Sequence, residues 1–152
     1  MARARIDDSI GYAAVEAAVA GLGLHPTSTP HQAAAPHQAA APHHAATVAG
    51  GVDRTTLATA VRFSLQLLAE RAKGNTVEVR VPPFAAVQCI EGPGHTRGTP
   101  PNVVEMDAET WLSLATGALE WMPGVEAGRI HASGQRADLR GLVPIAGLRM
   151  TS

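Results

Sequence analysis

Apolar residues recur with the period of an α-helix just after position 52. Leu57, Val61, Leu65 and Leu68 fall on one helical face, and this three-to-four-residue spacing is typical of a helix that packs against a core. Asp53 precedes the series and is a favourable N-cap residue. The pattern predicts a helix over residues 53–73, and Gly74 is a suitable residue to end it.

The period then changes from helical spacing to strict alternation. Val77, Val79 and Val81 alternate with Glu78 and Arg80, which predicts a strand with one buried face. Two prolines at 82–83 end that strand. A second, less regular strand is predicted over 84–90, a turn-rich loop follows, and a third strand is predicted over 102–106.

The remaining chain alternates between short helical and extended patterns. Asp107 is positioned to cap a helix over 108–116, with Trp111, Leu114 and Ala115 on its inner face. A bend with one short helical turn is predicted after it, then a short strand over 129–133. A last helix is predicted over 134–143, closed by Pro144. This order predicts an α+β domain with a mostly antiparallel sheet and helices on one side.

The N-terminal third has a different composition. A helix is predicted from Asp7 or Asp8 to about residue 20, but its face is mostly alanine, so we expect it to be marginal unless it docks. Residues 25–51 contain a proline-spaced PHQAAA repeat. In an extended polyproline conformation its histidines would lie roughly 19 Å apart, too far to share one ion. The sequence therefore predicts three parts: a helical segment at 1–24, a linker at 25–51 and a domain at 52–152.

Charge and cysteine content exclude several classes of protein. The net charge is −1, and residues 53–152 carry ten basic and ten acidic residues. The absence of a basic stripe argues against a nucleic-acid partner. No apolar run approaches the ~20 residues that span a bilayer, and acidic residues interrupt the first apolar region, so we expect a soluble, cytoplasmic protein without an integral membrane segment. The single cysteine, Cys89, is expected to be buried and inert.

Candidate catalytic groups are few. The ionisable candidates are His95, Arg97 and His131, and His131 is expected to point outward because it is opposite in phase to Ile130. Arg97 lies in a glycine-rich loop and offers a forked donor set for an anion, although a simple surface turn explains the same residues. No phosphate loop, nucleophile elbow or zinc signature is present. We therefore expect no catalytic residue, no metal site and no cofactor.

Several stretches resemble the bacterial branch of the sterol carrier protein superfamily. They are VEVRVPPFAAVQC, HTRGTPPNVVE, TWLSLATG and GRIHASGQRADL, within about residues 57–143. The resemblance implies a curved sheet of about four to five strands whose helices enclose an apolar cavity. It also implies non-catalytic binding of a lipid or another hydrophobic small molecule.

Bulky side chains are the candidates for contact with such a ligand, in a pocket between helix 53–73, helix 108–116 and the sheet. The candidate ligand-binding residues are Phe63, Leu68, Phe84, Arg97, Trp111, Leu114, Trp121 and Met122. Each apolar one is equally suited to filling the core. Arg97 would meet a head group at one mouth of the pocket.

Two other interpretations remain open. The superfamily resembles the C-terminal domain of mycothiol-dependent maleylpyruvate isomerases, which suggests an accessory domain without its own catalytic site. The helical bundle that carries the metal site in those enzymes has no counterpart in residues 1–51, which precede the domain and are mostly linker. The alternative is a protein-interaction module that recruits a partner through its N-terminal helix or linker.

Overall fold

The computed structural model describes residues 4–26, 51–93, 98 and 100–149. Its elements follow in the order α1 (Asp8–Leu22), α2 (Arg54–Arg71), β1 (Val77–Val81), β2 (Ala85–Cys89), β3 (Val103–Glu105), α3 (Ala108–Thr116), α4 (Trp121–Glu126) and β4 (His131–Ser133). The predicted α+β class is confirmed. Most of the predicted linker, with its histidine repeat, lies outside the described residues, as does Arg97.

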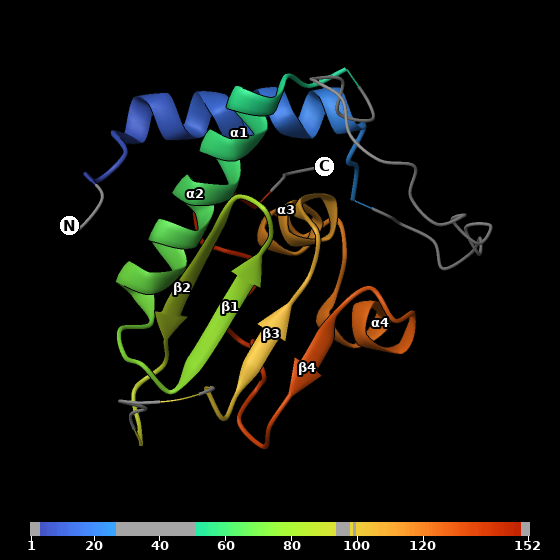
Figure 1. Ribbon diagram of the computed structural model, residues 1–152. Coiled ribbons are helices and arrows are strands. Elements are labelled where there is room, and N and C mark those ends of the chain that lie inside the picture. The colour runs from blue at the N-terminus through green and yellow to red at the C-terminus, as the bar shows by residue number, and fades with distance from the viewer. Residues whose placement is uncertain (1–3, 27–50, 94–97, 99, 150–152) are drawn as a thin grey trace.

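The four strands form one mixed sheet in the order β2-β1-β3-β4 (Figure 1). The β1–β2 and β3–β4 pairs are antiparallel, as predicted, whereas β1 and β3 run parallel. In the register, Val79 lies between Val87 on β2 and Val104 on β3. These valines therefore share the face that packs against the helices, and Glu78 and Arg80 lie on the opposite face.

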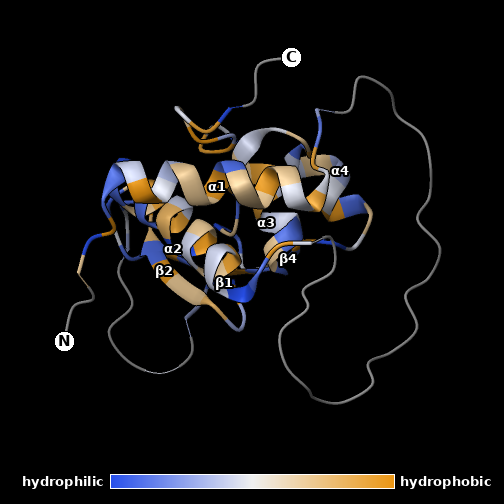
Figure 2. Ribbon diagram, turned by 90° about the horizontal axis from the view of Figure 1, so that it is seen from above, coloured by the Kyte–Doolittle hydropathy of each residue, from blue (hydrophilic) through white to orange (hydrophobic). Residues whose placement is uncertain are grey.

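Two helices cover the apolar face of the sheet, and a third crosses above them. α2 runs alongside β2, and α3 lies behind the sheet (Figure 1). Seen from above, α1 crosses over both helices (Figure 2). The crossing is close because Gly11 has no side chain: a Cβ there would lie 2.2 Å from the Phe63 ring. Tyr12 also meets that ring edge to face, with ring centroids 5.1 Å apart. The N-terminal helix is therefore docked.

The predicted last helix is wrong. Residues 134–143 form turns and one isolated bridge between Arg140 and Val143. Polar side chains take backbone amides that a helix would use: Asn102 accepts from the Arg136 amide at 3.0 Å, and Asp138 accepts from the Arg140 amide at 2.9 Å. Such local bonds compete with helix formation. Leu139 is nevertheless fully buried, so this segment still contributes to the core.

Candidate functional site

The structure places the eight predicted ligand-binding residues in different environments. Four of them are fully buried in the core: Phe63, Leu68, Trp111 and Leu114. Phe84 and Trp121 are nearly buried, whereas Met122 on α4 is 45% exposed. Arg97 is outside the described residues. The fold therefore brings the core four together between α2, α3 and the sheet, and it does not bring Met122 to them.

The space between α2 and α3 contains a direct polar link as well as apolar side chains. Nε1 of Trp111 donates to Oγ of Ser64 at 2.8 Å, and that hydroxyl donates to the Ala60 carbonyl at 2.8 Å. Both side chains are fully buried. Trp111 thus packs as a core residue with its one polar atom satisfied, which is the usual arrangement for a buried indole.

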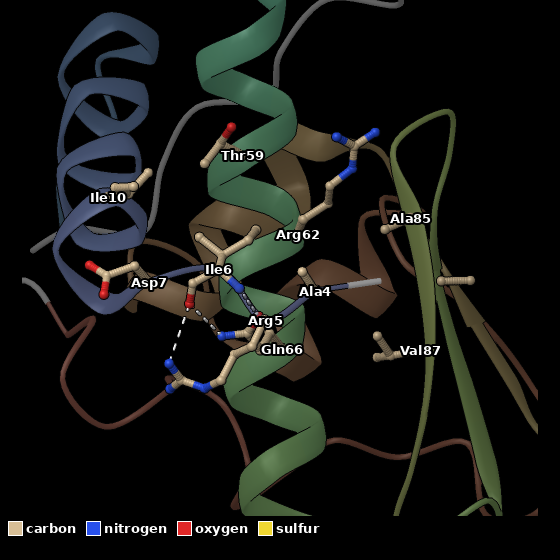
Figure 3. A pocket seen from close by; sticks show the side chains of 11 residues that line it. Ala4, Arg5, Ile6, Asp7, Ile10, Thr59, Arg62, Gln66, Ala85 and Val87 are labelled. Atoms are coloured by element: carbon tan, nitrogen blue, oxygen red, sulfur yellow. Dashed lines mark hydrogen bonds between the residues drawn. The ribbon is translucent and has the colours of Figure 1, made fainter. Parts of the chain in front are cut away.

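One hollow lined by described residues is an open groove of about 810 Å³. It lies between the start of α1, the exposed side of α2 and β2 (Figure 3). Ile6 and Ile10 contribute from the N-terminal side, Arg62 from α2, and Ala85 and Val87 from β2. Its volume falls within the range of roughly 300–1,000 Å³ that is usual for small-molecule sites. The groove is the candidate site.

Residues 4–7, which precede α1, are tied to α2 by a paired hydrogen bond. The Ile6 amide donates to Oε1 of Gln66 at 2.8 Å, and Nε2 of Gln66 donates to the Ile6 carbonyl at 3.1 Å. The Gln66 amide therefore binds this backbone as a neighbouring strand would. Arg5 adds an ion pair with Glu70, with Nε and Oε1 2.8 Å apart. These contacts fix the position of Ile6 at one end of the groove.

The start of α1 is set by Asp7. Its carboxylate accepts from the Ser9 amide at 2.9 Å and from the Ser9 hydroxyl, and both bonds lower the pKa of Asp7. Hydrogen bonds from Arg5 to Glu70 and Asp8 raise the pKa of the Arg5 guanidinium. Asp7 and Arg5 are therefore ionised at neutral pH, and each already has its partners inside the protein.

Two smaller hollows lie elsewhere. One of about 560 Å³ separates α1 from the C-terminal segment and is lined by Tyr12, Val19, Leu24 and Leu148, among others. The other, of about 410 Å³, lies at the turn between β1 and β2 beside Phe84. None of the three lies between α2, α3 and the sheet, where the sequence placed the ligand.

Among the described residues, side chains able to perform chemistry are dispersed, and the candidates His95 and Arg97 lie outside the described part of the chain. Cys89 is fully buried, as predicted, and burial raises the pKa of its thiol to about 11, so it is a poor nucleophile at neutral pH. His131 is exposed and Ile130 buried, as predicted. Among the described residues, no three metal-ligating side chains gather into one possible site.

A comparison with known protein families identifies the family to which the chain belongs. The family model described as a bacterial SCP ortholog matches residues 53–145. The chain belongs to this family. The bacterial sterol carrier protein-like region runs from the N-cap of α2 to Ile145, so α1 and the residues before it are outside the match. No curated protein matches the chain.

Five of the eleven residues that line the groove, namely residues 4–7 and Ile10, therefore lie outside the family region. The sequence analysis missed Ile6, Ile10 and Gln66. The available signal was the pair of isoleucines four residues apart, which are the large aliphatic side chains at the start of an alanine-rich helix.

Proposed function

We propose that this bacterial sterol carrier protein-like domain binds a lipid or another hydrophobic small molecule without changing it chemically, and that the groove beside α2 and β2 is the binding site. The family supports the general role of a hydrophobic carrier. The absence of a clustered catalytic set among the described residues is compatible with binding alone.

The observation that carries this proposal is the uncovered apolar surface of the groove. Ile10 is 61% exposed although it is a large aliphatic residue, and Ile6, Ala85 and Val87 lie only partly buried around the same hollow. Covering such surface stabilises a complex by about 25 cal/mol per Å² removed from water. A decyl chain laid along the groove would bury these four side chains together.

The ligand-binding residues predicted from the sequence have other roles in this proposal. Phe84 lies beside the groove, since Arg62 donates to its carbonyl, whereas the four core residues support the walls from within. Met122 and Trp121 would contact a ligand only at a separate site near α4. In the described part of the chain, no helix has the length and apolarity needed to cross a membrane.

The test begins with native mass spectrometry and lipid extraction of the purified full chain. Decan-1-ol is then titrated into wild type, Ile10→Gln and Ala13→Gln. Ala13 is exposed on α1 but does not line the groove, so it controls for adding an amide to that helix. We expect Ile10→Gln to weaken decanol binding several-fold and Ala13→Gln to leave it unchanged.

Other results would redirect the proposal. Met122→Gln is a third variant, and a loss of binding there, with Ile10→Gln unaffected, would move the site to α4. A protein that purifies without lipid and binds no decanol would contradict the carrier role. The interaction or accessory role would then be the better explanation for the domain.

A further inference from the structure

The charged side chains that line the groove differ in whether they have a partner within the protein. Arg5 is paired with Glu70 and Asp8, each at 2.8 Å, and Asp7 caps α1 through Ser9. Arg62 differs, because its bond is from Nε to the Phe84 carbonyl at 3.3 Å. In the described part of the chain, no carboxylate lies within ion-pair distance of Arg62. The four terminal N–H donors of its guanidinium therefore have no acidic partner.

A second arginine, Arg54, contacts the same phenylalanine without lining the groove. The guanidinium carbon of Arg54 lies 5.4 Å from the centroid of the Phe84 ring, a cation–π distance. Among the described ion pairs, none includes Arg54. Phe84 is thus contacted by two arginines, through its ring and its carbonyl. The acidic group that lines the groove, Asp7, lies on the α1 side, whereas Arg62 extends toward β2 (Figure 3).

This asymmetry has a chemical consequence for what the groove accepts. A half-buried guanidinium that lacks an internal counterion attracts an anion, and its fork matches the two oxygens of a carboxylate or phosphate. Apolar side chains from residues 6, 10, 85 and 87 line the same hollow. The groove thus presents a cation next to apolar surface, which is complementary to a molecule with an acidic head and an aliphatic chain.

We propose that the ligand class is an acidic single-chain amphiphile, with its carboxylate or phosphate monoester bound by Arg62 and its chain on Ile6, Ile10 and Val87. Arg62 is then the residue that selects for the head group, and Arg54 strengthens the local positive field. This inference rests on the proposed function, because it names the substrate class for the same groove.

The experiment compares three ligands with the same chain: decanoate, decyl phosphate and decan-1-ol, all below their micellar concentrations, by isothermal titration calorimetry. Each is titrated into wild-type full chain, Arg62→Gln, Arg62→Lys and Arg71→Gln. Arg71 is exposed in the last turn of α2 and does not line the groove. It therefore controls for the loss of one positive charge on the same helix.

We expect wild type to bind at least one of the two anions about 10-fold more tightly than the alcohol, in line with a charge-assisted hydrogen bond at a partly exposed site. Arg62→Gln should remove this preference, because it weakens binding of the anion much more than binding of decanol, whereas Arg71→Gln should retain it. Arg62→Lys should restore part of it, since the charge returns without the fork. The preferred anion distinguishes a carboxylate from a phosphate ligand.

Several results would overturn the inference, and they distinguish its failure from the failure of the proposed function. If decanol and the anions bind equally in wild type, or if Arg71→Gln loses as much as Arg62→Gln, the head-group role of Arg62 is wrong while hydrophobic binding stands. If none of the three ligands binds wild type, the proposed function itself fails. Inorganic phosphate alone should bind too weakly to measure, and tight binding of it would refute the need for an aliphatic chain.

Discussion

Gly11 is a position at which one added methyl group should have a large effect. Gly11→Ala would ordinarily stabilise a helix by about 0.8–1.0 kcal/mol, because alanine is the better helix former. Here the new Cβ would lie 2.2 Å from both Cγ and Cδ2 of Phe63 and 2.5 Å from Cε2. Phe63 is fully buried and also packs against Tyr12, so a shift of its ring would disturb other packed groups.

The magnitude follows from these opposing effects. Overpacking a filled interior costs typically 1–3 kcal/mol, and occasionally more. A contact more than 1 Å shorter than ordinary carbon–carbon packing belongs at the upper end of that range. Even after the gain in helix propensity, we expect Gly11→Ala to lower the free energy of unfolding by about 2 kcal/mol. For a chain of this size that is roughly 4–8 °C in Tm.

The assay is urea and thermal unfolding followed by circular dichroism, with two companion variants. Ala13→Gly, on the exposed side of α1, measures the propensity difference in the same helix. Phe63→Leu removes the ring that the methyl group would meet, so Gly11→Ala should cost much less in the Phe63→Leu background than in wild type. A rise in Tm for Gly11→Ala in wild type would refute the close crossing of α1 over α2.

Two further predictions concern the core. Trp111→Phe and Ser64→Ala should each destabilise, and their double variant should reveal a coupling free energy of about 1 kcal/mol from the Nε1–Oγ hydrogen bond; simple additivity in urea denaturation would show that the bond contributes nothing. Because burial raises the pKa of Cys89 from its ordinary value near 9 to about 11, the folded state holds this proton more tightly, so the stabilisation is complete below about pH 9 and is lost as pH rises to about 11, by roughly 2–3 kcal/mol. Comparing wild type with Cys89→Ala across that window should show a shallower decline for the variant, and parallel curves would contradict the linkage.

Local sequence signals predicted the elements whose stability is local. The aspartates at 7, 53 and 107 are the N-caps of α1, α2 and α3, and each carboxylate accepts a backbone amide two or three residues later. The valine alternation in β1 correctly assigned its buried face. Both signals depend on contacts within a few residues, which is why the sequence alone was sufficient.

Features that depend on distant partners could not be predicted in the same way. The pattern of β1 shows which face is buried but not which strand lies beside it, so the parallel neighbour β3 was missed. Residues 134–143 carry helix-compatible side chains, yet the Asn102 side chain, 34 positions before Arg136, binds its amide. A tertiary contact of this kind overrides local propensity.

The candidate site could not be predicted because an apolar residue type does not show whether the side chain is exposed or buried. Phe63, Leu68, Trp111 and Leu114 were reasonable ligand contacts, because a pocket wall and a filled core use the same residue types. Their burial assigns them to the core. Side chains that remain partly uncovered carry more information about binding, and exposure is a property of the packed fold that a sequence pattern does not contain.

The N-terminal helix α1 shows how a contact that the sequence pattern did not predict forms part of the groove. Its alanine-rich face predicted a helix that is marginal unless it docks, but small residues also let two helices approach closely, and Gly11 allows the Phe63 ring to pack directly on the α1 backbone. That close crossing places Ile10 at the groove, while Gln66 of α2 holds Ile6 beside it. The residues that lie outside the family region thus complete the wall opposite β2. If the groove binds its ligand as proposed, α1 adds to the family fold a surface that the matched region, residues 53–145, does not supply.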